Sequence, residues 1–286
     1  MRPFGRCFAK APDPARIWQD ITRWLQERKT SESQAETGND SHPPLPSALR
    51  SNVPSCDPFF IGREQVLADL HRGFEQKAYR LLTIIGPGGI GKTELAKHLA
   101  NDLSDLFPLR RYVDLTPAVS VDGICSKIAE WFKVPQLPTS KDPVQAIEDI
   151  LSNTPHMLLV LNNFEQAVEW AMSTVGVWMQ NLEHVQFLVT SCEPLGIPGE
   201  HRYQLPPLPV PSKDLDGRAL LEGRARNESV SLFVDRARRT DTEFELDEDN
   251  VEDVLAICRK LCGDPFNIIA VASTSHQASP AEMLED

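Results

Sequence analysis

The stretch Gly86-Pro87-Gly88-Gly89-Ile90-Gly91-Lys92-Thr93 decides how this chain is interpreted. It fits the pattern G-x-x-x-x-G-K-[ST], follows a short apolar run at 81–85, and opens a helical pattern with Leu95, Leu99 and Leu103 on one side. A strand before the glycines and a helix after them are the context that this pattern requires. The sequence therefore predicts a loop that holds phosphate groups between a strand and a helix.

Each part of this loop has a chemical role. Glycines allow backbone N–H groups to turn inward around a phosphate, and the start of the following helix adds a partial positive charge. We expect Lys92 to bridge the β- and γ-phosphates and Thr93 to offer its hydroxyl to Mg²⁺. The expected phosphate-binding residues are Gly86, Pro87, Gly88, Gly89, Ile90, Gly91, Lys92, Thr93 and Glu94. A chance glycine-rich turn is the alternative, but it does not explain the strand and helix on the correct sides.

Around the loop, short apolar runs alternate with amphipathic helical stretches from residue 59 to 205. This alternation is typical of βαβ units and a parallel sheet. The expected strands are 81–85, 112–115, 157–161, 185–190 and 202–205. The fold class predicted for 59–205 is α/β, with helices covering both faces of the sheet.

The regions on either side of 59–205 have different patterns. A proline cluster at 206–211 interrupts the sheet pattern, and 206–280 is expected to be a small all-helical domain before a tail at 281–286. Residues 1–29 include apolar positions at helical spacing, which predicts an amphipathic helix. Residues 30–58 are rich in Ser, Glu, Asn, Asp and Pro, and are expected to form a disordered linker.

Composition limits the partners. The formal net charge is -12 and the pI is about 5.1, which argues against specific nucleic-acid binding because such proteins need basic surface. No apolar run reaches the roughly 20 residues that cross a bilayer, so we expect no membrane contact. The six cysteines are scattered, which favours reduced thiols and a cytoplasmic protein.

Four further stretches resemble motifs of the STAND class of P-loop NTPases. Residues 60–64 read Phe-Ile-Gly-Arg-Glu, similar to the entry motif of that class, and the apolar run 157–161 leads into Asn162 like a Walker B strand. Residues 190–195 read Thr-Ser-Cys-Glu-Pro-Leu, like its sensor strand, and 261–266 read Leu-Cys-Gly-Asp-Pro-Phe, like its G-L-P motif. With the phosphate loop, five motifs follow the family's order, and the pattern is similar to those of NB-ARC-like and bacterial regulatory NTPases.

The resemblance implies a five-stranded parallel sheet, with the P-loop strand near its centre, followed by a small helical domain. It also implies ATP or ADP as ligand, Mg²⁺ as cofactor, and a protein partner or self-assembly as output. The implied adenine contacts are Phe60, Ile61, Gly62, Arg63 and Pro265. The implied Mg²⁺ contacts are Thr93 and the Walker B position, Asn162.

Two positions depart from that pattern. Asn162 stands where the family has Asp, and Cys192 stands where it has a sensor Arg. Arginines that contact a transferring phosphoryl group contribute about 10³ to 10⁵ in rate, so we expect slow or absent hydrolysis. Glu165 is the nearest acid and is either a catalytic residue or an ordinary surface glutamate. Cys192 has no cationic neighbour in the sequence that would activate its thiol.

Three functional hypotheses follow. The first is an ATP/ADP-binding regulatory switch module in which the nucleotide sets the angle between the two domains across 206–211. The second is an active ATPase that uses Glu165. The third is an adaptor that works without nucleotide, and unchanged thermal stability on adding ATP or ADP would identify it.

Overall fold

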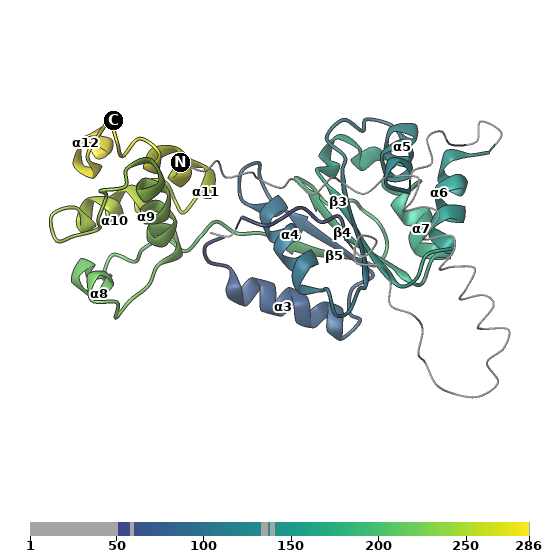
Figure 1. Ribbon diagram of the computed structural model, residues 1–286, viewed down its shortest axis with the longest axis horizontal. Coiled ribbons are helices and arrows are strands. Elements are labelled where there is room, and N and C mark those ends of the chain that lie inside the picture. Colours follow the sequence, from purple (N-terminus) through teal and green to yellow (C-terminus); the bar gives the residue numbers. More distant parts are fainter. Residues whose placement is uncertain (1–50, 58–59, 133–136, 138–140, 286) are drawn as a thin grey trace, which may run out of the picture.

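The computed structural model describes residues 51–57, 60–132, 137 and 141–285. The amphipathic helix predicted at 1–29 and most of the predicted linker lie outside the described residues. Figure 1 shows a sheet-containing domain at one end of the molecule and a cluster of helices at the other.

The first domain is built on one parallel five-stranded sheet in the order β2-β3-β4-β1-β5. The strands are β1 (Leu81–Ile85), β2 (Leu109–Asp114), β3 (Met157–Asn162), β4 (Val185–Ser191) and β5 (Glu200–Gln204). The predicted sheet is confirmed. The strand before the phosphate loop, β1, is interior but lies one place from the β5 edge, between β4 and β5.

Helices cover both faces of this sheet, as expected for strands that are apolar on both sides (Figure 1). Along β3, Leu158 and Val160 join the core under α3 (Glu64–Glu75) and α4 (Lys92–Asp102). The alternate residues of β3, Leu159 among them, join the core on the other face. That face is covered by α5 (Val121–Phe132), α6 (Pro143–Ser152) and α7 (Val175–Asn181), and two short 3-10 turns, η1 (Phe164–Gln166) and η2 (Val168–Trp170), follow β3.

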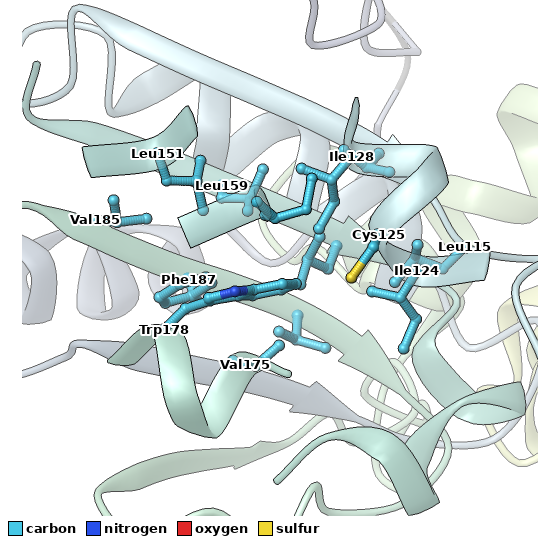
Figure 2. Packing of buried hydrophobic residues seen from close by; sticks show 14 of the residues in the cluster. Leu115, Ile124, Cys125, Ile128, Leu151, Leu159, Val175, Trp178, Val185 and Phe187 are labelled. Carbon is cyan, nitrogen blue, oxygen red and sulfur yellow. The ribbon is translucent and has the colours of Figure 1, made fainter. Parts of the chain in front are cut away.

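Trp178 of α7 is the largest fully buried side chain in the described residues. Figure 2 shows it with Phe187 of β4 and with Ile128 and Cys125 of α5 in one shared interior. Its indole N–H donates a hydrogen bond to the carbonyl oxygen of Val144 at 3.1 Å, which satisfies the buried polar atom and ties α7 to α6.

Strand β2 begins three residues earlier than the predicted strand 112–115. Arg110 and Arg111 break the apolar pattern at its start, yet both are buried. Their guanidinium groups donate to backbone carbonyl oxygens, of Phe107 at 2.7 Å and of Arg110 at 3.1 Å respectively. Such hydrogen bonds offset part of the cost of burying an arginine.

The end of the predicted linker differs from expectation, because residues 51–57 lie against the folded domains. Ser51 forms a parallel bridge with Arg110 at the β2 edge. The side chain of Asn52 exchanges two hydrogen bonds with the backbone of Tyr112, at 2.7 and 2.8 Å. These contacts extend the sheet edge by a short segment that its polar composition did not reveal.

The second domain is all helical. It comprises α8 (Gly217–Leu221), α9 (Glu228–Thr240), α10 (Val251–Lys260), α11 (Pro265–Ala272) and α12 (Pro280–Glu285), around a core centred on Phe233 and Leu255. The residues assigned to a tail at 281–286 therefore include most of a short helix, and Met283 and Leu284 pack on that core. No helix among the described residues is sufficiently long and apolar to span a membrane.

Candidate functional site

The loop 86–93 connects the carboxyl end of β1 to the first turn of α4. Gly89 and Gly91 have φ angles of 79° and 98°, in the left-handed region that favours glycine. A Cβ added at Gly88 or Gly91 would meet no heavy atom within 4 Å. The backbone of the loop is therefore open to a ligand at these two positions.

Lys92 lies at the mouth of this loop and is 6% exposed. Its Nζ donates to the carbonyl oxygens of Gly86 at 2.8 Å and Pro87 at 3.1 Å. The same Nζ is 3.6 Å from Sγ of Cys192, an exposed residue. The expectation that Cys192 has no cationic neighbour is therefore wrong.

The reason for this contact is the strand order. β1 and β4 are parallel neighbours with Ile85 paired to Ser191, so the residues that follow each strand meet at the same edge of the sheet. The sensor position and the phosphate loop come together although 100 residues separate Lys92 from Cys192.

Thr93 and Asn162, the two residues expected near Mg²⁺, are in direct contact. The Thr93 hydroxyl donates to Oδ1 of Asn162 at 2.9 Å, and the Thr190 hydroxyl donates to the same oxygen at 2.9 Å. The hydroxyl and amide oxygens of these side chains are suitable Mg²⁺ ligands, because Mg²⁺ prefers hard oxygen ligands and keeps several waters. The described residues hold no group of three His, Cys, Asp or Glu side chains that could bind a metal. A Mg²⁺ here would therefore depend on nucleotide phosphates for further ligands.

Asp114 is a carboxylate at this edge that sequence reasoning missed. It ends β2 as the register partner of Asn162 at the end of β3. Burial alone would raise the pKa of Asp114, but hydrogen bonds from Thr116, Asn163 and Asn162 outweigh it and hold this pKa below its usual range. The signal available in the sequence was an acid near the end of the predicted strand 112–115.

Glu165 lies in η1, immediately after β3. It is half-buried, and its Oε2 is buried without a hydrogen-bond partner among the described residues. This environment differs from that of an ordinary exposed surface glutamate, the alternative in the sequence analysis.

A mainly apolar cavity of about 170 Å³ lies beside the phosphate loop, between the two domains. It is smaller than the roughly 300 to 1,000 Å³ of sites that enclose a whole ligand, which suits a pocket for one part of a larger molecule. Its lining includes Phe60, Ile61, Arg63, Gly89, Ile90, Gly91, Glu94 and Pro265 from the predicted contacts. Gly62 is not in this lining; it faces Glu228 of α9, which a Cβ at Gly62 would strike.

Arg63 is fixed by the fold and is 5% exposed. Its φ is 67°, and its Nη2 donates to the carbonyl oxygen of Ile90 in the phosphate loop at 3.0 Å. Burial lowers the pKa of Arg63, and the nearby Glu228 partly offsets this effect. The arginine therefore connects the stretch 60–64 to the phosphate loop.

The helical domain supplies cavity residues that the sequence did not single out. Leu208, Leu232 and Ile269 join Pro265 in the lining. Asp57 and Arg236 form a polar rim, with Arg236 Nη2 and Asp57 Oδ2 2.7 Å apart. In the sequence, Leu232 and Ile269 look like ordinary members of a helical apolar stripe, so only their place in the fold identifies them.

Comparison with known proteins supports this fold. Residues 75–195 match the family model described as an AAA domain. The chain is similar to the Walker-type ATPase of Pyrococcus abyssi, with a TM-score of 0.51 at 13% identity, covering 80% of this chain and 72% of that one. The fold is therefore that of the P-loop NTPases.

A STAND protein with a tetratricopeptide repeat sensor, from Pyrococcus horikoshii, gives a TM-score of only 0.42 at 17% identity. The aligned region covers 74% of this chain and 29% of the Pyrococcus horikoshii protein. An uncharacterized protein of Mycobacterium tuberculosis is 29% identical over 79% of this chain and 53% of its own length. A protein of the same organism named as an HTH-type transcriptional regulator is 29% identical over 72% of this chain and 21% of its own length. The chain thus spans about half, or less, of these curated relatives.

Proposed function

We propose that this chain is an ATP/ADP-binding regulatory switch module of the STAND type, with slow or absent hydrolysis. The observation that carries the proposal is the apolar cavity beside the phosphate loop, because both domains line it. Phosphates held at 86–93 would place the adenine base in this cavity, against Ile61 on one side and Pro265 on the other. A ligand that contacts both domains better in one arrangement stabilises that arrangement.

The segment between the domains limits where such a movement takes place. Leu205 N–H donates to Ile85 O at 2.8 Å and so belongs to the sheet domain. Leu208 N–H donates to Gly263 O at 2.9 Å, and Pro209 O accepts from Ser229 at 2.9 Å, so these residues belong to the helical domain. We infer that the pivot is 206–207, a narrower hinge than the 206–211 of the sequence analysis.

Slow hydrolysis follows from the two altered positions. Asn162 is neutral, and Cys192 offers no cation to the γ-phosphate. Binding depends on other groups: the loop amides, the Lys92 ammonium, and Thr93 with Mg²⁺. The proposed module therefore retains nucleotide for long periods and acts through which nucleotide is bound.

The test is calorimetric titration of ATP and ADP in the presence of Mg²⁺. Lys92→Met removes one charge-assisted hydrogen bond to phosphate, which is expected to weaken binding about 10- to 100-fold. Lys127→Met is the matched control: Lys127 pairs with Glu130 on the outside of α5, so affinity should not change. Absence of binding by the unmodified protein at millimolar nucleotide would remove the proposal.

The switch itself is tested by small-angle X-ray scattering of the ADP- and ATP-bound forms. A change in the radius of gyration between them is expected, since the domains rotate about 206–207. Identical scattering curves with both nucleotides bound would leave a nucleotide-binding protein that is not a switch.

A second candidate function is a slow ATPase, favoured by the unpartnered buried oxygen of Glu165. Such an oxygen has no competing hydrogen bond, so it could accept a proton from an attacking water once the side chain turns toward that water. Phosphate release that is lost in Glu165→Gln but retained in Glu169→Gln would support it; Glu169 is an exposed residue four positions further along. Phosphate release no faster than that of Lys92→Met excludes it.

We propose a protein partner or self-assembly as the output. Similarity to a relative named as a transcriptional regulator agrees with a module that controls another protein domain. Co-purification of the ATP-bound and ADP-bound forms with the segments of that relative outside the matched region would measure whether partner binding depends on the nucleotide.

A further inference from the structure

The ends of β2 and β3 place two polar residues side by side. Asp114 and Asn162 are register partners, and the N–H of Leu115 donates to the backbone oxygen of Asn162 at 2.8 Å. Neighbouring strands are about 4.8 Å apart, so these two side chains leave the same edge of the sheet within reach of one another. A carboxylate on β2 thus stands next to the position where a Walker B acid would stand on β3.

Hydrogen bonds fix the carboxylate in this place. Asp114 Oδ1 accepts from the Thr116 hydroxyl at 2.7 Å and from Nδ2 of Asn163 at 3.1 Å. The backbone N–H of Thr116 also donates to Asp114 Oδ1, at 3.1 Å. The negative charge is therefore held toward β3 by groups from both neighbouring segments.

Asn162 connects this carboxylate to the phosphate loop. Its Oδ1 accepts from Thr93 and Thr190, which leaves its Nδ2 for other acceptors, and Asp114 is its register partner on β2. These two hydroxyl donors select the orientation of the amide in which Oδ1 faces Thr93 and Thr190. Asp114, Asn162 and Thr93, the residue expected at Mg²⁺, thus follow one another at this edge of the sheet.

We propose that Asp114 supplies from β2 the negative charge toward Mg²⁺ that Asn162 no longer supplies from β3. This inference rests on the proposed nucleotide-binding function. Mg²⁺ keeps several waters when it binds to proteins, so a carboxylate can act on it through a bound water without direct contact. Asp114 is a positioning residue for the ion and its waters. Asn162 is the neutral residue between Asp114 and the ion.

The register also explains why Asn suits position 162. An Asp there would place two carboxylates at directly paired positions, and like charges at this separation disfavour ionisation of both. Asn162→Asp alone should therefore fail to restore a strong metal site. Moving the charge back to β3 requires the double change, Asp114→Asn with Asn162→Asp.

The experiment measures ADP affinity by calorimetry, once with excess Mg²⁺ and once with EDTA. Loss of a carboxylate outside the direct ligands typically weakens metal binding about 10- to 100-fold, so Asp114→Asn should remove a Mg²⁺-dependent tightening of that order. Affinity in EDTA should stay at the unmodified level, which also shows that the variant is folded. The double variant should regain the Mg²⁺ effect, whereas Asn162→Asp alone should not exceed the unmodified protein.

Asp102→Asn is the control, because Asp102 is an exposed acid at the other end of α4 and the change in charge is the same. An unchanged Mg²⁺ effect in both Asp114→Asn and Asp102→Asn would overturn the assignment of Asp114 and leave nucleotide binding intact. Failure of the unmodified protein to bind ADP under either condition would overturn the proposed function itself.

Discussion

Gly263 lies at the contact between the connecting segment and the helical domain, just before Pro265 of the cavity. Its φ is 70°, and a Cβ added there would lie 2.0 Å from the carbonyl oxygen of Leu208. Leu208 is 4% exposed, and its backbone cannot move away easily because its own N–H donates to Gly263 O. Gly263→Ala should therefore be strongly destabilising.

Three effects contribute to the loss. A left-handed backbone costs an L-residue about 1 to 2 kcal/mol. Displacing Leu208 weakens one hydrogen bond, worth about 1 kcal/mol. Forcing a methyl group into occupied space costs about 1 to 3 kcal/mol. The free energy of unfolding of the helical domain should fall by about 3 to 6 kcal/mol in total.

Gly223→Ala is the matched comparison. Gly223 also has a φ of 70°, but a Cβ there would meet no heavy atom within 4 Å. Only the backbone cost of about 1 to 2 kcal/mol should apply. Urea unfolding followed by far-UV circular dichroism gives both values, with an unchanged denaturant slope showing that the same surface is exposed. Equal losses in the two variants would refute the importance of the Leu208 contact.

Two further predictions follow from the same geometry. Bound nucleotide should slow alkylation of Cys192, because phosphates at Lys92 would cover its thiol. Cys262, which is exposed and outside the cavity lining, should be alkylated at an unchanged rate. Peptide mass spectrometry measures both rates, and equal alkylation of Cys192 with and without nucleotide would contradict the proposed site. Trp178→Phe should lower the free energy of unfolding by about 2 to 4 kcal/mol through a lost hydrogen bond and lost packing. Trp131→Phe, at a residue 41% exposed, should cost less than about 0.5 kcal/mol in the same urea titration, and similar values for the two would count against this picture.

Some corrections have a common physical cause. Sequence patterns identify buried strands by their apolar residues, so the buried Arg110 and Arg111 hid the start of β2. Polar composition likewise suggested that residues 51–57 belong to a linker, although the side chain of Asn52 satisfies the backbone of an edge strand. In each case a polar side chain bonds to backbone groups, and hydrophobic patterns do not reveal such pairing. The partner of Asn52 is 60 residues away, whereas Arg110 and Arg111 bond to carbonyl groups nearby in the chain.

The phosphate loop and the α/β layout were determined by the sequence alone. A loop of glycines between a strand and a helix depends on consecutive residues and their main-chain amides, so local pattern is sufficient to find it. The alternation of strands and helices is equally local, because the periods of 2 and 3.6 residues appear directly in the chain.

Only the tertiary structure decided which residues meet at the site. The order β2-β3-β4-β1-β5 brings Cys192 to Lys92 and Asp114 to Asn162, and no pattern within one segment specifies which strands become neighbours. The approach of the helical domain likewise turned Leu232 and Ile269 into cavity residues. Side-chain contacts between segments depend on how the layers pack, and that packing is a property of the whole chain.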